Sequence, residues 1–166
     1  MRRIDYATLS KWCTDQGYEL REWVPALPNP ARTMTSRMFD NVQLLPEFLD
    51  ILVNIADTER LVWIRDWTIW NERSQDLGLR CLDLLTANLP ESERAIDSHA
   101  YLLGAAEWRE AIALLLPPIL FGWDAHLLFR SGALAVNVSH HGRIDLSFSN
   151  ESATWAERLS RWCEMA

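Results

Sequence analysis

The chain of 166 residues lacks the cationic surplus with which nucleic-acid-binding proteins neutralise phosphate groups. It has 16 lysine and arginine residues against 23 aspartate and glutamate residues, a formal net charge of −7 at pH 7. Proteins that bind phosphate backbones cluster cationic side chains on one surface, so we do not expect a nucleic-acid partner. An anionic protein favours a basic partner instead, because opposite charges speed the encounter of two proteins.

The sequence also lacks an apolar run long enough for a membrane helix. Its longest uncharged stretch, residues 111–123, contains two prolines and has thirteen residues. A membrane helix needs about 20 apolar residues. The first residues are basic, but no unbroken apolar segment follows them as it would in an export signal. We therefore expect a cytoplasmic protein that binds no membrane.

Cysteine is scarce, and its spacing excludes the common zinc motifs. Cys13, Cys81 and Cys163 are far apart, and each stands among apolar residues at helical spacing. A zinc site needs close ligand pairs such as Cys-x-x-Cys, and no such pair occurs. The cysteines are expected to be buried free thiols in a reducing compartment, with no metal and no other cofactor.

Sequence motifs for catalysis are missing as well. No glycine-rich phosphate loop follows a strand-like segment, and there is no Gly-x-Ser-x-Gly nucleophile elbow. The sequence therefore assigns no catalytic residue. Whether the protein is an enzyme stays open, and a non-enzymatic role is favoured.

The residues that are present have the balance of a globular protein. Hydrophobic residues make up 49% of the chain and charged residues 23%. A chain of this length buries enough surface for one core, so a single domain over residues 1–166 is expected.

Five segments have apolar residues at the spacing of amphipathic helices. They are residues 6–16, 45–56, 77–88, 107–116 and 155–163. Asp5 is a candidate N-cap of the first helix. Pro117 and Pro118 are expected to end or kink the fourth, because a proline ring displaces the preceding turn. Residues 25–36 contain prolines at positions 25, 28 and 30 and are expected to form an extended loop.

Strand-like segments account for most of the rest. The run from Leu61 to Trp70 is apolar on both faces, which is typical of a strand in the middle of a sheet. Residues 99–103 form a short strand. Residues 124–130, 133–139 and 143–148 are separated by tight turns and form an antiparallel meander.

These elements predict an α+β fold with two layers. Helices pack on one side of a mostly antiparallel sheet, the strand over residues 61–70 is central, and the C-terminal meander has three strands.

Four polar residues are candidates for a ligand site. Asp124 and His126 are two positions apart on a predicted strand, so their side chains point the same way, and His140 lies in a nearby hairpin. A carboxylate and imidazoles on neighbouring strands can form an acid–base pair. The structural alternative is that Asp124 pairs with an arginine and that the turn histidines face water.

The fourth candidate is Arg65, which stands in the apolar central strand beside Asp66. An unpaired charge there would cost several kcal/mol, so Arg65 needs a partner or a route to solvent. It either pairs within the protein or binds an anionic group in a cleft lined by Trp63 and Trp67.

Tryptophan is the most over-represented residue. The chain has nine, roughly four times the usual frequency. Most are expected in the core, and a few partly exposed ones would anchor a protein interface, where tryptophan and arginine are favoured.

Three segments carry a resemblance to other proteins. The strand of residues 63–70, the segment of residues 118–125 (PILFGWDA) and the hairpin of residues 139–142 (SHHG) resemble recurring blocks of small uncharacterised bacterial proteins. Those proteins often have a carboxylate where His141 stands here. The resemblance implies a bacterial cytosolic setting and no mechanism.

Two functional hypotheses follow. The first is a non-enzymatic protein-binding domain, of the immunity or antitoxin kind, whose acidic, tryptophan-bearing surface covers a basic partner. The alternative is a small-molecule-binding protein or hydrolytic enzyme with a polar pocket around Asp124, His126 and His140, joined by Arg65. A structural or regulatory subunit that forms a homo-oligomer is a third possibility.

Overall fold

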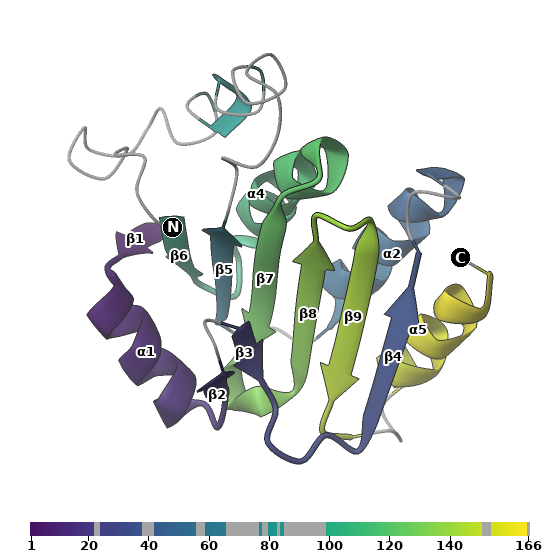
Figure 1. The fold of residues 1–166 in the computed structure, drawn as a ribbon, viewed down its shortest axis with the longest axis horizontal. Helices are drawn as coiled ribbons and strands as arrows, with labels where there is room; N and C mark the ends of the chain where they lie inside the picture. The colour runs from purple at the N-terminus through teal and green to yellow at the C-terminus, as the bar shows by residue number, and fades with distance from the viewer. Residues whose placement is uncertain are drawn as a thin grey trace.

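A seven-stranded antiparallel sheet runs through the protein (Figure 1). The computed structural model describes residues 1–21, 24–37, 42–55, 59–65, 77, 80–82, 84, 99–150 and 154–165. Across the sheet the strands are β1 (Arg2–Ile4), β6 (His99–Leu103), β5 (Arg60–Arg65), β7 (Asp124–Phe129), β8 (Leu134–Ser139), β9 (Arg143–Phe148) and β4 (Arg32–Ser36). The predicted α+β class, the mostly antiparallel sheet and the C-terminal meander are confirmed.

Three helices form a layer on one face of this sheet. They are α2 (Leu45–Asn54), α4 (Trp108–Phe121) and α5 (Thr154–Met165). Their apolar sides pack on alternate strand residues, such as Val62 and Ile64 of β5 and Val136 of β8, which form one buried cluster with them. None of the described helices is long and apolar enough to cross a membrane.

The described residues cover the opposite face of the sheet only in part. Helix α1 (Tyr6–Asp15) and a small hairpin of β2 (Glu19–Arg21) and β3 (Val24–Ala26) lie on this side (Figure 1). Leu9, Trp12 and Cys13 of α1 form a second buried cluster with Leu61 and Trp63 of β5. Helix α1 is therefore an exception to the predicted helices on one side. The reason is that β5 is apolar on both faces, and both faces must be removed from water.

The uncovered half of this second face is polar, and we call it the open face. Because successive side chains of a strand alternate between faces, the residues that do not point at the helix layer lie here. The open face consists of Thr33, Thr35, Asn137, Ser139, Arg143, Asp145 and Ser147, all exposed or half-buried.

Local signals in the sequence placed several elements correctly. Asp5 caps α1, its carboxylate accepting a hydrogen bond from the backbone N–H of Thr8 at 2.8 Å. Strand β5 is an interior strand between β6 and β7, as predicted, up to Arg65. Residues 66–70 of the predicted central strand lie outside the described residues, as do most of those in the helix predicted over residues 77–88.

One local prediction was wrong, and one left two outcomes open. Residues 32–36 form strand β4 at the edge of the sheet, within the segment expected to be a loop. For the fourth helix, an end or a kink was expected at Pro117 and Pro118, and the helix does not end there: α4 continues through both prolines to Phe121. Both prolines are buried, and burial of the apolar side chains around them outweighs the backbone hydrogen bonds that they cannot donate.

The Tyr18 hydroxyl joins the segment after α1 to the connection between β7 and β8. It lies 2.7 Å from the carbonyl oxygen of Phe129 and 2.8 Å from that of Leu134, and it accepts the backbone N–H of Phe129 at 3.1 Å. Because Tyr18 is buried, these contacts satisfy backbone groups that water does not reach. They fix where the covered half of this face ends and the open face begins.

Candidate functional site

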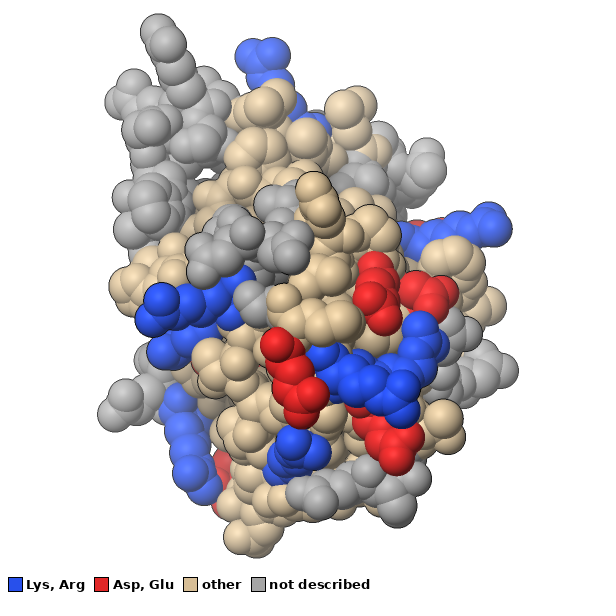
Figure 2. Space-filling model, turned by 90° about the vertical axis from the view of Figure 1, so that its right-hand side faces the viewer, with Lys and Arg blue, Asp and Glu red and all other residues tan. Residues whose placement is uncertain are grey.

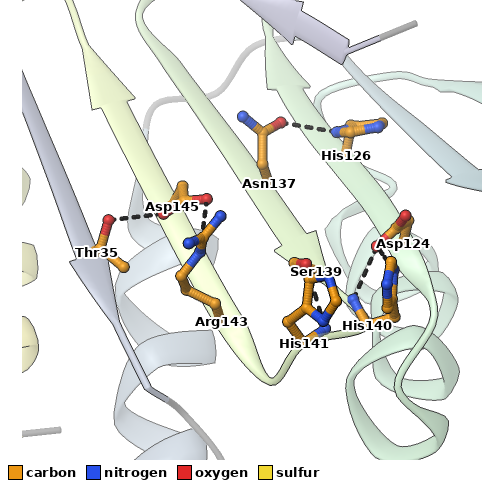
Figure 3. A network of polar contacts seen from close by, with 9 residues as sticks. All are labelled: Thr35, Asp124, His126, Asn137, Ser139, His140, His141, Arg143 and Asp145. Atoms are coloured by element: carbon orange, nitrogen blue, oxygen red, sulfur yellow. Dashed lines mark hydrogen bonds and ion pairs between the residues drawn. The ribbon is translucent and has the colours of Figure 1, made fainter.

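A row of side chains crosses the sheet at one level and ends on the open face (Figure 3). In the strand register Trp63 faces His126, His126 faces Asn137, Asn137 faces Asp145, and Asp145 faces Thr35. Neighbouring members of this row are close enough to interact because they lie directly opposite one another on adjacent strands. The row therefore links the buried half of this face to its exposed half.

His126 is the buried polar member of this row. Its Nδ1 donates a hydrogen bond to Oδ1 of Asn137 at 2.7 Å, and its ring lies 5.3 Å from the ring of Trp63. Only 3% of the residue is exposed, and Nε2 has no hydrogen-bond partner among the described residues. The pKa of His126 is lowered to about 4, mainly by burial and to a smaller extent by the charge of Arg65, while the hydrogen bond with Asn137 and the charge of Asp124 act in the opposite direction. His126 is therefore neutral at physiological pH.

Asp124 and His140 form the second polar contact of the region. Oδ1 of Asp124 accepts hydrogen bonds from the backbone N–H of His140 at 2.8 Å and from its Nδ1 at 2.9 Å. Both side chains are about one-fifth exposed (20% and 23%). The His141 ring lies 4.0 Å from the His140 ring. The contact holds the β8–β9 turn against the first residue of β7 (Figure 3) and orients the His140 imidazole.

Arg65 lies at the end of β5, directly opposite Asp124 in the register. Its guanidinium carbon is 5.3 Å from the ring centroid of Trp63, a cation–π contact. Trp67, the second tryptophan expected beside it, lies outside the described residues.

The four predicted site residues thus share one face of the sheet and one end of it. Asp124 and His140 are in direct contact, and Arg65 stands across from Asp124. His126 also lies on this face, but its hydrogen bond goes to Asn137 instead of Asp124.

Sequence reasoning missed three polar residues of the open face. Asp145 accepts a hydrogen bond from the Thr35 hydroxyl at 2.6 Å and lies 3.3 Å from Nε of Arg143. The signal was present, since Arg143 and Asp145 are charged residues at the polar positions of an alternating strand, but Thr35, the partner of Asp145, belongs to a strand that was not predicted.

The structure also bears on metal binding and on the reactivity of the cysteine thiols. Among the described residues, no three or more histidine, cysteine, aspartate or glutamate side chains are arranged to hold a metal ion. Burial raises the pKa of the Cys13 thiol to about 12 and that of Cys163 to about 11. Both thiols are therefore protonated at neutral pH and poor nucleophiles.

The described tryptophans are mostly in the core. Trp12, Trp63, Trp123 and Trp162 are buried, whereas Trp108 is 36% exposed and Trp155 is half-buried. Trp108 and Trp155 belong to the helix layer. Trp23, Trp67 and Trp70 lie outside the described residues.

Comparison of the chain with protein-family models, curated proteins and solved structures found no match.

Proposed function

We propose that this protein is a non-enzymatic protein-binding domain, of the immunity or antitoxin kind, and that it binds a basic partner through its open face. The observation that carries the proposal is that the described residues leave half of one sheet face uncovered, and this half presents hydrogen-bonded polar side chains at its centre. Free thiols at Cys13, Cys81 and Cys163 support a cytoplasmic setting for it.

The central carboxylate of the open face is held in place before any partner binds. One oxygen of Asp145 accepts the Thr35 hydroxyl, and the other faces Arg143. A carboxylate has about four acceptor positions, so Asp145 retains capacity for a cation of the partner. Because Asp145 is already ordered, binding costs less side-chain entropy than it would for a mobile residue.

Charge supports a basic partner in particular. The formal net charge of −7 attracts a cationic protein over a distance of about a Debye length, near 8 Å at physiological salt. The exposed or half-buried tryptophans, Trp108 and Trp155, lie on the helix layer, so the proposal assigns the contact to Asp145 of the open face.

A charge-removal experiment tests this proposal. The partner is captured from the source organism, identified by mass spectrometry and purified, and its affinity for the protein is measured at several salt concentrations. Asp145→Asn is expected to weaken binding about tenfold, or roughly 1.4 kcal/mol, because a desolvated charge contact is lost. The affinity should also fall as salt increases.

The matched control is Glu157→Gln on α5, whose side chain is 71% exposed on the helix layer. It removes the same charge from a different face and should change the affinity less than twofold. An acidic partner, or a basic partner that binds the Asp145→Asn variant as tightly as the original protein, would contradict the proposal.

The Asp124–His140 contact favours a second function, a small-molecule-binding or hydrolytic site. A carboxylate bonded to Nδ1 orients the imidazole, as an acid–base pair requires. If this function is correct, hydrolysis of ester or phosphate substrates should fall at least about a hundredfold in His140→Gln. The adjacent substitution His141→Gln should have little effect. Equal activity of the two variants, or none in the original protein, would exclude a hydrolytic role.

A further inference from the structure

Strand β4 ends the sheet, and its outer edge lies beside no other strand among the described residues (Figure 1). An edge of this kind presents backbone N–H and C=O groups that can pair with another strand. Which groups point outward follows from the hydrogen-bonding pattern of the two strands next to it.

The hydrogen bonds between β8 and β9 determine which backbone groups of β9 point toward β4. These in turn determine which backbone groups of β4 point out of the sheet. Ser149 donates its backbone N–H to the carbonyl of Ala133 at 3.2 Å, which makes the neighbouring register pair of Leu134 and Phe148 a non-hydrogen-bonded pair. The backbone groups of Phe148 therefore point away from β8, toward β4. The same holds for every second residue of β9, and their register partners on β4 are Arg32, Met34 and Ser36.

The backbone groups of Thr33 and Thr35 consequently point out of the sheet. Both residues are exposed, and neither has a backbone hydrogen bond on its outer side among the described residues. Their side chains are fixed against β9, Thr35 on Asp145 at 2.6 Å and Thr33 near Ser147 at 3.4 Å. Strand β4 contains neither lysine nor proline, the residues that commonly prevent edge pairing. The edge is thus ordered and ready for another strand.

We propose that β4 pairs in antiparallel fashion with β4 of a second copy of this chain, with a two-fold axis at Met34. In this register Thr33 of each copy faces Thr35 of the other, and each of the two pairs exchanges both of its backbone hydrogen bonds. All outward-pointing backbone N–H and C=O groups of Thr33 and Thr35 are then hydrogen-bonded. Threonine pairs opposite one another also stabilise a sheet through their side chains.

The charges around β4 are compatible with a second copy. Arg32 faces Ser36 of the other copy in this register, so like charges do not lie directly opposite each other. The side of the molecule beside β4 carries cationic and anionic groups interspersed (Figure 2). Helix α5, which contacts β4, carries ion pairs of Arg158 with Asp50 of α2 at 2.8 Å and of Arg161 with Glu157 at 3.6 Å. A surface with both signs can meet its own two-fold copy with opposite charges in contact, whereas a surface of one sign would repel it.

Such a dimer has one continuous sheet, and it places the two open faces side by side. This follows from the position of β4, which is both the sheet edge and a strand of the open face. The inference is independent of the proposed function, since the pairing uses backbone groups of the edge and leaves Asp145 accessible on the face.

Oligomeric state and amide exchange test the pairing together. Sedimentation should show twice the mass of one chain at high concentration and dissociation on dilution. Residue-resolved hydrogen exchange should show the amides of Thr33 and Thr35 slowed about tenfold or more in the dimer and unprotected in the monomer. A single-chain mass at every concentration would overturn the proposal. So would a dimer in which these two amides exchange freely.

Substitutions at the two threonines test the register. Thr35→Pro removes an outward N–H and the hydroxyl contact with Asp145 but leaves the backbone hydrogen bonds between β4 and β9 intact, and it should abolish the dimer. If that variant does not fold, two double variants test the register in its place. Thr33→Lys with Thr35→Lys places like charges opposite each other in both pairs and should dissociate the dimer.

Thr33→Glu with Thr35→Lys places opposite charges there and should retain the dimer. Equal dimerisation of these two double variants would show that another surface, or another register, is used, and would overturn the proposal.

Discussion

Trp162→Ala is expected to lower the free energy of unfolding by about 3–5 kcal/mol, because it leaves a large cavity between α5 and α2. The Trp162 side chain is fully buried, and its ring stacks on Phe48 with 4.6 Å between centroids. Its Nε1 donates a hydrogen bond at 2.9 Å to the carbonyl of Leu44, at the start of α2. The substitution removes the apolar contact and also leaves this carbonyl without its partner.

Urea denaturation followed by circular dichroism measures this loss. Trp108→Ala is the matched control, because it deletes the same side chain at a position 36% exposed, and it should cost less than about 1 kcal/mol. Trp162→Phe should fall between the two, since it keeps an aromatic ring beside Phe48 but loses the hydrogen bond. Similar costs for Trp162→Ala and Trp108→Ala would show that Trp162 does not join α5 to α2 in the way described.

The parts of the fold that were predicted from the sequence depend on local patterns. The meander of β7, β8 and β9 has short turns between alternating strands, so neighbours in sequence are neighbours in the sheet. Strand β5 was recognised because it is apolar on both faces. The helices α2 and α5 each carry one apolar stripe, and each packs that stripe on the sheet.

The parts that were missed depend on contacts between distant segments. Strand β4 follows three prolines and pairs with β9, more than a hundred residues later, so no local signal indicates its partner. Helix α4 retains Pro117 and Pro118 because they are buried in the assembled core, a tertiary effect that outweighs their low helix propensity. The face on which α1 packs also depends on the assembled sheet.

The candidate site also combines features that follow from a local pattern with features that depend on contacts between distant segments. The spacing of Asp124 and His126 correctly placed both side chains on one face, since alternation is a property of a single strand. The hydrogen-bond partner of each side chain depends on the register between neighbouring strands, and the sequence alone does not determine this register. Thus His140 contacts Asp124, while His126 is hydrogen-bonded to Asn137. No pattern in the strand of Asn137 indicated that this residue belongs to the site.

Stability should fall as the pH is lowered from about 6.5 to about 4, by roughly 3 kcal/mol from His126 alone. Burial lowers the pKa of His126 to about 4 in the folded protein, against an ordinary value of 6.5. Between these values the unfolded chain binds a proton at this position and the folded protein does not, so acid favours unfolding. The His126 contribution should be constant above about pH 6.5, where both states are neutral, and below about pH 4, where both are protonated.

The measurement is the free energy of unfolding as a function of pH, compared among variants because carboxyl groups also titrate in the lower part of this range. His126→Phe keeps a ring beside Trp63 but cannot titrate, so its profile should be flatter than that of the original protein by about 3 kcal/mol between pH 6.5 and 4. His141→Gln removes an exposed histidine and should leave the slope unchanged. If His126→Phe and the original protein lose stability in parallel, the imidazole is not held neutral by its burial, and the account of the row from Trp63 to Asn137 is wrong.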